Sequence, residues 1–213
     1  MGFLMFISRF MPNPRRRGFA SDNQGTAAIE FALIAPVALV LMIGAIEYSR
    51  AVVMARRFDI ITATLGDLIA RDDYEDATTM AGLKSAVETI WSPYPKETLV
   101  LQVVAVRQGM PTAGNGLANK NYVYWSEDVK IDPAAVPANT YADCAQYPGL
   151  PTGMLSPGGS TIIVNSQYTF KTMLGWKVPA MTGNTMKWER SYNYSPRNLC
   201  TAWGSANCTQ NCE

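Results

Sequence analysis

A single carboxylate interrupts the longest apolar run of the sequence. Glu30 is the only charged residue between Ala27 and Ile46, and a carboxylate at mid-bilayer costs about 2.5–3.5 kcal/mol. Glu30 lies one turn inside the run, so its carboxylate could reach the membrane surface. A second interpretation involves a cut between Gly25 and Thr26, which would place a new ammonium about 6 Å along a helix from Glu30. The carboxylate could then neutralise its own terminus or that of a neighbouring subunit.

Four cysteines could form disulfides or hold a metal ion, and all lie in the last third of the chain: Cys144, Cys200, Cys208 and Cys212. The spacing C-x7-C-x3-C lacks the C-x2-C knuckle of structural zinc sites, so disulfides in an oxidising compartment are the preferred interpretation. Four cysteines allow three pairings. We favour a small Cys208–Cys212 loop and a Cys144–Cys200 bridge, and the sequence leaves the other pairings open.

The composition argues against catalysis. The chain of 213 residues contains no His, which removes the commonest general base, the triads built on it and most zinc sites. Asp72, Asp73, Glu75 and Asp76 are clustered but lack the Gly turn and twelve-residue spacing of a calcium loop, and Asp76 is better interpreted as a helix N-cap. The net charge of +1 gives no argument for nucleic acid. We therefore expect no catalytic residue, metal, cofactor, nucleic acid or small-molecule substrate.

The apolar run predicts one transmembrane helix. Twenty residues at about 1.5 Å each cover roughly 30 Å, the thickness of a bilayer core. A cleaved secretory signal would have a shorter apolar region followed by an A-x-A site. We expect a leader over residues 1–25, a transmembrane helix over 26–49 and a head domain over 50–213.

Basic residues before the run predict its orientation. A short N-terminal segment that carries "RRR" at 15–17 is poorly translocated. The N-terminus should therefore stay in the cytoplasm and the head should lie across the membrane. The start of the chain, "MGFLMFISRFM", is apolar, so translation could begin at Met1 or at Met11.

The rest of the chain predicts helices followed by strands. The first helix should continue unbroken to Ile69, with one apolar stripe on its head portion: Phe58, Ile61, Leu65, Leu68 and Ile69. A second helix should carry Met80, Leu83, Val87, Ile90 and Trp91. The "SPYP" stretch at 92–95 ends that helix.

Four strands are expected after the second helix. Residues 98–108 are almost wholly apolar and predict a central strand, and residues 121–125 predict a short one. The alternation in 161–171 places four side chains on one face: Ile162, Val164, Tyr168 and Phe170. In 186–195 the shared face holds Met186, Trp188, Tyr192 and Tyr194. Arg190 interrupts that face, as a buried pair or as a contact at the rim.

The segment "GTAAIEFALIAPVALVLMIGAIEYSRAVV" at 25–53 follows a basic leader and carries Glu five residues after Gly. It resembles the type IV pilin and pseudopilin signature and, within that superfamily, the TadE/TadG-like family of tight-adherence (Flp) pilus assembly proteins. A weaker likeness lies at 162–174 and 189–198. The resemblance implies cleavage between Gly25 and Thr26 by a prepilin peptidase, and a charge partner for Glu30. It also implies that Pro36, which otherwise predicts a harmless helix kink, is a point where the helix melts on extraction into a filament.

Together these expectations define an α+β protein: a long N-terminal transmembrane helix, and a small pilin-like head with a second helix and an antiparallel sheet of about four strands. The resemblance implies a minor pseudopilin-like protein in tight-adherence pilus assembly, in the bacterial inner membrane with a periplasmic head. Its partners would be the bilayer, a prepilin peptidase, other pilins and pseudopilins and the assembly platform. The alternative is an uncleaved membrane-anchored periplasmic binding or adhesive domain.

Overall fold

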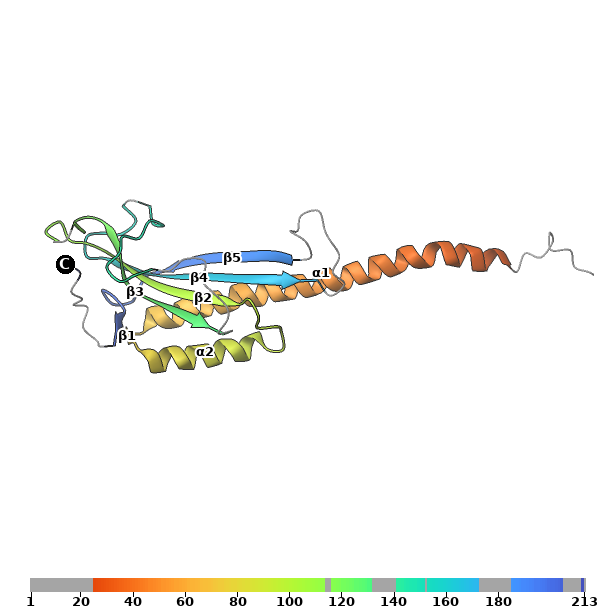
Figure 1. The fold of residues 1–213 in the computed structure, drawn as a ribbon, viewed down its shortest axis with the longest axis horizontal. Coiled ribbons are helices and arrows are strands. Elements are labelled where there is room, and N and C mark those ends of the chain that lie inside the picture. Colours follow the sequence, from red (N-terminus) through yellow and green to blue (C-terminus); the bar gives the residue numbers. More distant parts are fainter. Residues whose placement is uncertain are drawn as a thin grey trace, which may run out of the picture. The chain divides into compact units, whose positions relative to one another are not determined.

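The computed structural model of the protein describes residues 25–113, 116–131, 141–151, 153–172, 185–204 and 212. Along the chain the elements are α1 (Thr26–Arg71), β1 (Tyr74–Glu75), α2 (Ala77–Trp91), β2 (Val100–Gln108), β3 (Asn121–Lys130), β4 (Ser160–Lys171), β5 (Thr185–Tyr194) and β6 (Ala202–Trp203). The expected α+β fold is confirmed (Figure 1). The chain divides into two compact units, one ending at Ile46 and the other, which contains the predicted head, beginning at Glu47.

The first helix is unbroken, as predicted, and runs for 46 residues through Pro36. Within the head its large buried hydrophobic residues recur every three or four positions: Met54, Phe58, Ile61, Leu65 and Ile69, each at most 2% exposed. The prediction for Leu68 is wrong, since its side chain is 38% exposed. Successive helical residues point about 100° apart, so Leu68 lies on the flank of the stripe that Leu65 and Ile69 form.

Asp76 caps α2, as the sequence predicts. Its Oδ1 accepts hydrogen bonds from the backbone N–H groups of Thr78 at 2.8 Å and Thr79 at 2.7 Å. The Thr79 hydroxyl in turn accepts the Asp76 N–H at 2.8 Å, which completes a capping box. Met80, Val87 and Trp91 are buried, whereas Ile90 is 37% exposed and so departs from the predicted stripe.

The other end of α2 is tied to α1 by a guanidinium group. Arg57 donates from Nη1 to the backbone carbonyls of Ile90 at 3.1 Å and Ser92 at 2.9 Å. These are carbonyl groups that the helix end leaves without an intrahelical partner. The same guanidinium lies 5.0 Å from the ring centre of Tyr94.

The main sheet is antiparallel, with the strand order β3-β2-β4-β5. The predicted central strand is confirmed, because β2 pairs with a strand on each side. The third strand is longer than the expected 121–125 and extends to Lys130. The extension contains polar residues, so it lacks the apolar pattern from which a strand is predicted. One of these residues, Asp128, accepts a hydrogen bond at 3.0 Å from Gln102 on the adjacent strand.

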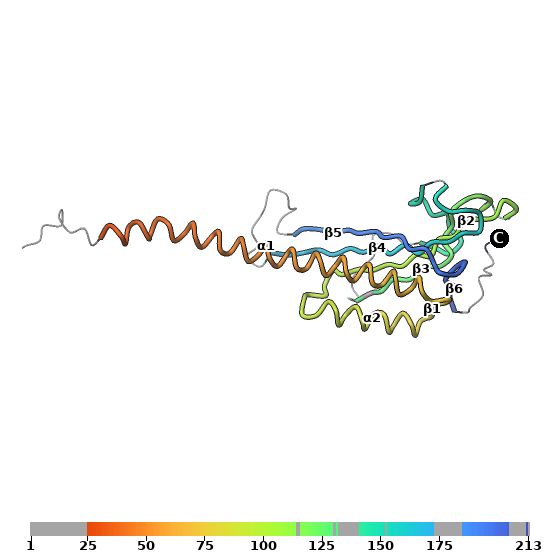
Figure 2. The backbone as a smooth tube through the Cα atoms, turned by 180° about the vertical axis from the view of Figure 1, so that it is seen from behind, coloured from red at the N-terminus to blue at the C-terminus, as the bar shows by residue number. Residues whose placement is uncertain are grey.

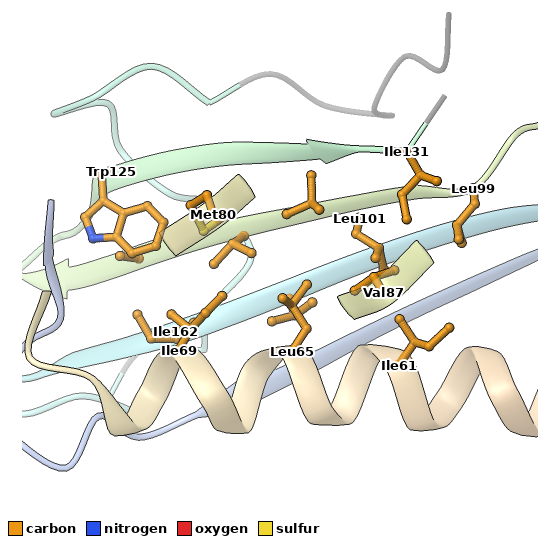
Figure 3. Close-up of a cluster of buried hydrophobic side chains, with 14 of the residues drawn as sticks. Ile61, Leu65, Ile69, Met80, Val87, Leu99, Leu101, Trp125, Ile131 and Ile162 are labelled. Atoms are coloured by element: carbon orange, nitrogen blue, oxygen red, sulfur yellow. The ribbon is translucent and has the colours of Figure 1, made fainter. Parts of the chain in front are cut away.

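The core lies between the sheet and the two helices. Figure 3 shows side chains from α1, α2 and the sheet that point toward one another, among them Leu65, Val87 and Leu101. The predicted inward face of β4 is confirmed: Ile162, Val164, Tyr168 and Phe170 are all at most 2% exposed. A smaller cluster lies on the opposite face of the sheet and includes Val104, Ile163 and Tyr147.

The outer strand β5 contacts the first helix at its rim. Met186, Trp188 and Tyr194 pack against the core. Arg190 donates from Nε to Asp59 Oδ1 at 2.9 Å, and the two side chains are 42% and 40% exposed. The alternative left open for Arg190 is therefore decided in favour of a rim contact.

A short parallel pair of strands, absent from the sequence prediction, links the end of α1 to the C-terminal region. Tyr74 of β1 lies opposite Ala202 of β6, and Glu75 lies opposite Trp203 (Figure 2). The Glu75 carbonyl accepts the Gly204 N–H at 2.7 Å. Two residues give a strand too little pattern for prediction from sequence.

Candidate functional site

The predicted cleavage bond lies where α1 begins. The helix starts at Thr26, directly after Gly25, and both residues are exposed. Cleavage would therefore release the new ammonium on the first residue of a helix. The site itself stays a prediction.

Glu30 is exposed in the first turns of α1. No described residue forms a hydrogen bond or an ion pair with its carboxylate. Its neighbours Ile29 and Phe31 are 63% and 72% exposed. The Glu30 carboxylate therefore lies on an exposed apolar stretch of the helix.

The segment around Glu30 is an apolar helix with no buried residue. Of the described residues, only α1 forms a helix long and apolar enough to cross a membrane, and none of its most apolar window is buried. A core helix of a soluble protein would bury such side chains. Exposed apolar surface costs about 25 cal/mol per Å² in water, so this helix is compatible with a membrane anchor. Pro36 lies within it and lacks the backbone N–H of an ordinary helical residue.

The structure contradicts both favoured disulfide pairings. Cys144 bonds to Cys212, with 5.4 Å between their Cα atoms. Cys200 is also disulfide-bonded, and Cys208 lies outside the described residues. The favoured pairings joined Cys208 to Cys212 in a small loop and Cys144 to Cys200 in a longer one, but a disulfide needs Cα atoms about 4.4–6.8 Å apart. The fold decides that separation, because Cys144 is held beside β3 by its N–H bond to the Val123 carbonyl at 2.8 Å.

The acidic cluster of the sequence is dispersed. Asp72 and Asp73 are exposed, Asp76 caps α2, and Glu75 is 0% exposed. Within the part of the chain that the structure describes, no three His, Cys, Asp or Glu side chains could hold a metal ion together.

The buried carboxyl of Glu75 is a feature that sequence reasoning missed. Neither carboxylate oxygen has a hydrogen-bond partner among the residues that the structure describes. Burial raises the pKa of Glu75 above its ordinary value of 4.5, the nearby Thr79 hydroxyl lowers it, and the charges of Asp72 and Asp76 raise it further. The single proton of the Thr79 hydroxyl is donated to the Asp76 carbonyl at 2.9 Å, so this hydroxyl leaves the Glu75 carboxyl without a hydrogen bond.

The geometry is thus an exposed apolar helix with one carboxylate near its start, joined in sequence to a packed α+β head. Residues 25–59 match the family model described as TadE-like protein. The resemblance identified from residues 25–53 is confirmed for this segment, which indicates a protein related to tight-adherence pili.

The TadE-like match includes the apolar run and the head helix as far as Asp59, the residue that contacts Arg190. The weaker likeness at 162–174 and 189–198 lies outside it. No curated protein and no solved structure matches the chain.

Proposed function

We propose that this protein is a minor pseudopilin-like membrane protein with a structural role in the assembly of a tight-adherence pilus. The observation that carries the proposal is the TadE-like match over 25–59, which coincides with an unburied apolar helix that has a lone Glu30 near its start. In this proposal the leader is 1–25, the transmembrane helix is 26–49 and the head is 50–213. The helix anchors the protein in the inner membrane, with the N-terminus in the cytoplasm and the head in the periplasm.

The proposal gives each residue of the anchor a task. A prepilin peptidase cuts between Gly25 and Thr26, and Glu30 then pairs with the new ammonium or with that of a neighbouring pilin or pseudopilin. Paired charges are tolerated in lipid where single ones are costly. Pro36 removes one backbone hydrogen bond of the helix and so eases its extraction into a filament. The head is a contact domain rather than a catalyst.

Processing separates this proposal from the alternative, an uncleaved membrane-anchored binding or adhesive domain. N-terminal sequencing of the protein extracted from membranes should find Thr26 first, in cells that contain a prepilin peptidase. An intact leader under those conditions would refute the pseudopilin proposal and favour the alternative.

Substitution of Glu30 tests the assembly step. Glu30→Ala should leave membrane insertion and cleavage intact, because it removes a charge from the span and does not alter the cut bond. Surface pili and crosslinks to neighbouring subunits should decrease, and Glu30→Asp should be intermediate because its carboxylate has a shorter reach. The matched control is Ile29→Ala, which shortens the adjacent side chain without changing the charge.

If Glu30→Ala and Ile29→Ala assemble equally well, Glu30 is an interface residue and the proposed charge pairing is wrong. Mass spectrometry of each variant verifies that cleavage is unchanged, so that a processing defect is not mistaken for an assembly defect.

A further inference from the structure

A small cavity lies beside the first head residues of α1. It has a volume of about 80 Å³, and its lining includes Arg50, Met54, Glu97, Tyr168, Phe170 and Lys171. The charged groups come from α1, from the loop before β2 and from the end of β4. The lining thus combines apolar and charged side chains. The volume has room for several water-sized atoms, as in a phosphate group.

Among the described residues, the two cations of the cavity keep donors that have no partner. Arg50 contacts Glu47 Oε2 through Nη1 at 3.4 Å, with side chains 32% and 17% exposed, and the guanidinium has other N–H groups. Lys171 is exposed, and no described residue forms an ion pair with its ammonium. An arginine and a lysine that converge on one cavity are a recognition pattern for phosphate oxygens.

Glu97 adds an opposite charge to the same cavity. The pKa of the Tyr168 hydroxyl is raised to about 12, chiefly by burial; the Glu97 carboxylate also raises it, and the Arg50 guanidinium lowers it. Both charges therefore act on this one phenol. The cavity offers cations for a phosphate and an anion for an ammonium, which is the charge pattern of a zwitterion.

The chain places this cavity near the membrane surface, a step that rests on the proposed membrane anchor. Residues 27–46 fill a hydrocarbon core of about 30 Å, and the headgroups add roughly 5–7 Å on each side. Arg50 follows Ile46 by four residues, or about 6 Å of helix. The guanidinium thus falls in the headgroup layer. Tyr48, which is 73% exposed, lies at the same level, where tyrosine is enriched in membrane proteins.

We propose that this cavity binds the headgroup of a zwitterionic phospholipid that carries a primary ammonium. Its phosphate is held by Arg50 and Lys171, its ammonium is directed to Glu97, and its glycerol end lies against Met54 and Phe170. The bound lipid would fix the orientation of the head on the bilayer.

The test reconstitutes the full chain in bilayers that contain phosphatidylethanolamine, phosphatidylcholine and phosphatidylglycerol in equal amounts. The protein is then transferred to mild detergent, and retained lipid is counted by native mass spectrometry. Phosphatidylethanolamine should be retained about tenfold over phosphatidylcholine, whose quaternary ammonium cannot donate a hydrogen bond to Glu97. Glu97→Gln should abolish this preference. Lys171→Gln should reduce retention of both zwitterionic lipids about tenfold.

Lys120→Gln is the matched control, because it makes the same charge change beside β3 at Asn121. Asn121 pairs with Gln108 at one end of β2, whereas Glu97 of the cavity precedes Val100 at the other end. The Lys120→Gln variant should therefore retain lipid as the wild type does. A preference for phosphatidylglycerol, no retained lipid, or an equal loss in Lys120→Gln would overturn the proposal.

Vesicle flotation of the same samples separates the two proposals. A wild-type protein that fails to float with vesicles lacks the membrane anchor, and the proposed function fails. A protein that floats but retains no zwitterionic lipid keeps its anchor, and only the headgroup site is refuted.

Discussion

Gly66 of α1 is the position at which a single methyl group should perturb the head most specifically. The residue is buried, and a Cβ atom added there would overlap the ring of Tyr194 on β5; even the third-nearest ring atom, Cζ, would lie only 2.9 Å away. Tyr194 pairs with Ile162 of β4, so the strand holds the backbone of this tyrosine in place. Gly66→Ala therefore forces the ring out of its position or separates the helix from the sheet.

Two effects of opposite sign determine the size of the change. Alanine favours a helix over glycine by about 1 kcal/mol, whereas overpacking a core costs about 1–3 kcal/mol. With overlap at several ring atoms we take the upper value, which leaves a net destabilisation of about 2 kcal/mol. In a chain of this size that loss lowers Tm by about 4–8 °C. Thermal unfolding of the full chain in detergent, followed by near-UV circular dichroism, measures it.

Gly82 provides the control, since it lies in α2 and an added Cβ would have no atom within 4 Å. Gly82→Ala should raise Tm by about 2–4 °C, because only the helix propensity changes. In a Tyr194→Ala background, where the ring is gone, Gly66→Ala should become stabilising as well. The reasoning is refuted if Gly66→Ala stabilises the wild-type chain as much as Gly82→Ala does.

Three further predictions concern Glu75, the cap of α2 and the disulfide. Because the raised pKa of Glu75 makes folding take up a proton, the free energy of unfolding should fall as pH rises from 4.5 through that pKa. Glu75→Gln should remove this dependence in denaturant titrations and be the more stable protein at neutral pH. Asp76→Ala should cost about 1 kcal/mol, whereas Asp76→Ser should recover most of it; equal losses would exclude capping as the cause. Thiol labelling of the denatured, unreduced protein should find almost no free thiol, and the double variant Cys144→Ser/Cys212→Ser should lose about 4 kcal/mol of stability under oxidising conditions only.

Local patterns predicted the elements of this fold well. The spacing of Phe58, Ile61 and Leu65 is sufficient to identify the buried face of α1, and the alternation of Ile162 and Val164 identifies the inward face of β4. Asp76 was recognisable as a cap because a cap depends only on its immediate neighbours. In the candidate site, the basic leader, Gly25, Glu30 and the apolar span together carried the resemblance to the TadE-like family, which the match over 25–59 confirms.

Contacts between distant parts of the chain were not predictable in this way. The Asp59–Arg190 pair joins residues 131 positions apart, and the cavity charges of Arg50, Glu97 and Lys171 come from three separate elements. Cys144 and Cys212 are 68 positions apart, and nothing in the local sequence distinguishes that pairing from the others. Glu75 lies in a polar stretch of sequence that is typical of a surface, yet it is buried in a strand that pairs with the distant β6.

The Cys144–Cys212 bond also determines how the head would respond to mechanical tension. It closes a covalent loop that contains β4, β5 and β6, whereas both helices and strands β2 and β3 lie outside it. A pulling force applied at the two ends of the chain would pass through the bond and bypass the loop. The disulfide then prevents the extension of the 68-residue loop, which would otherwise add roughly 220–250 Å to the length of the stretched chain. A head pulled in this way could lose its helices and still retain the paired β4 and β5 as a nucleus for refolding.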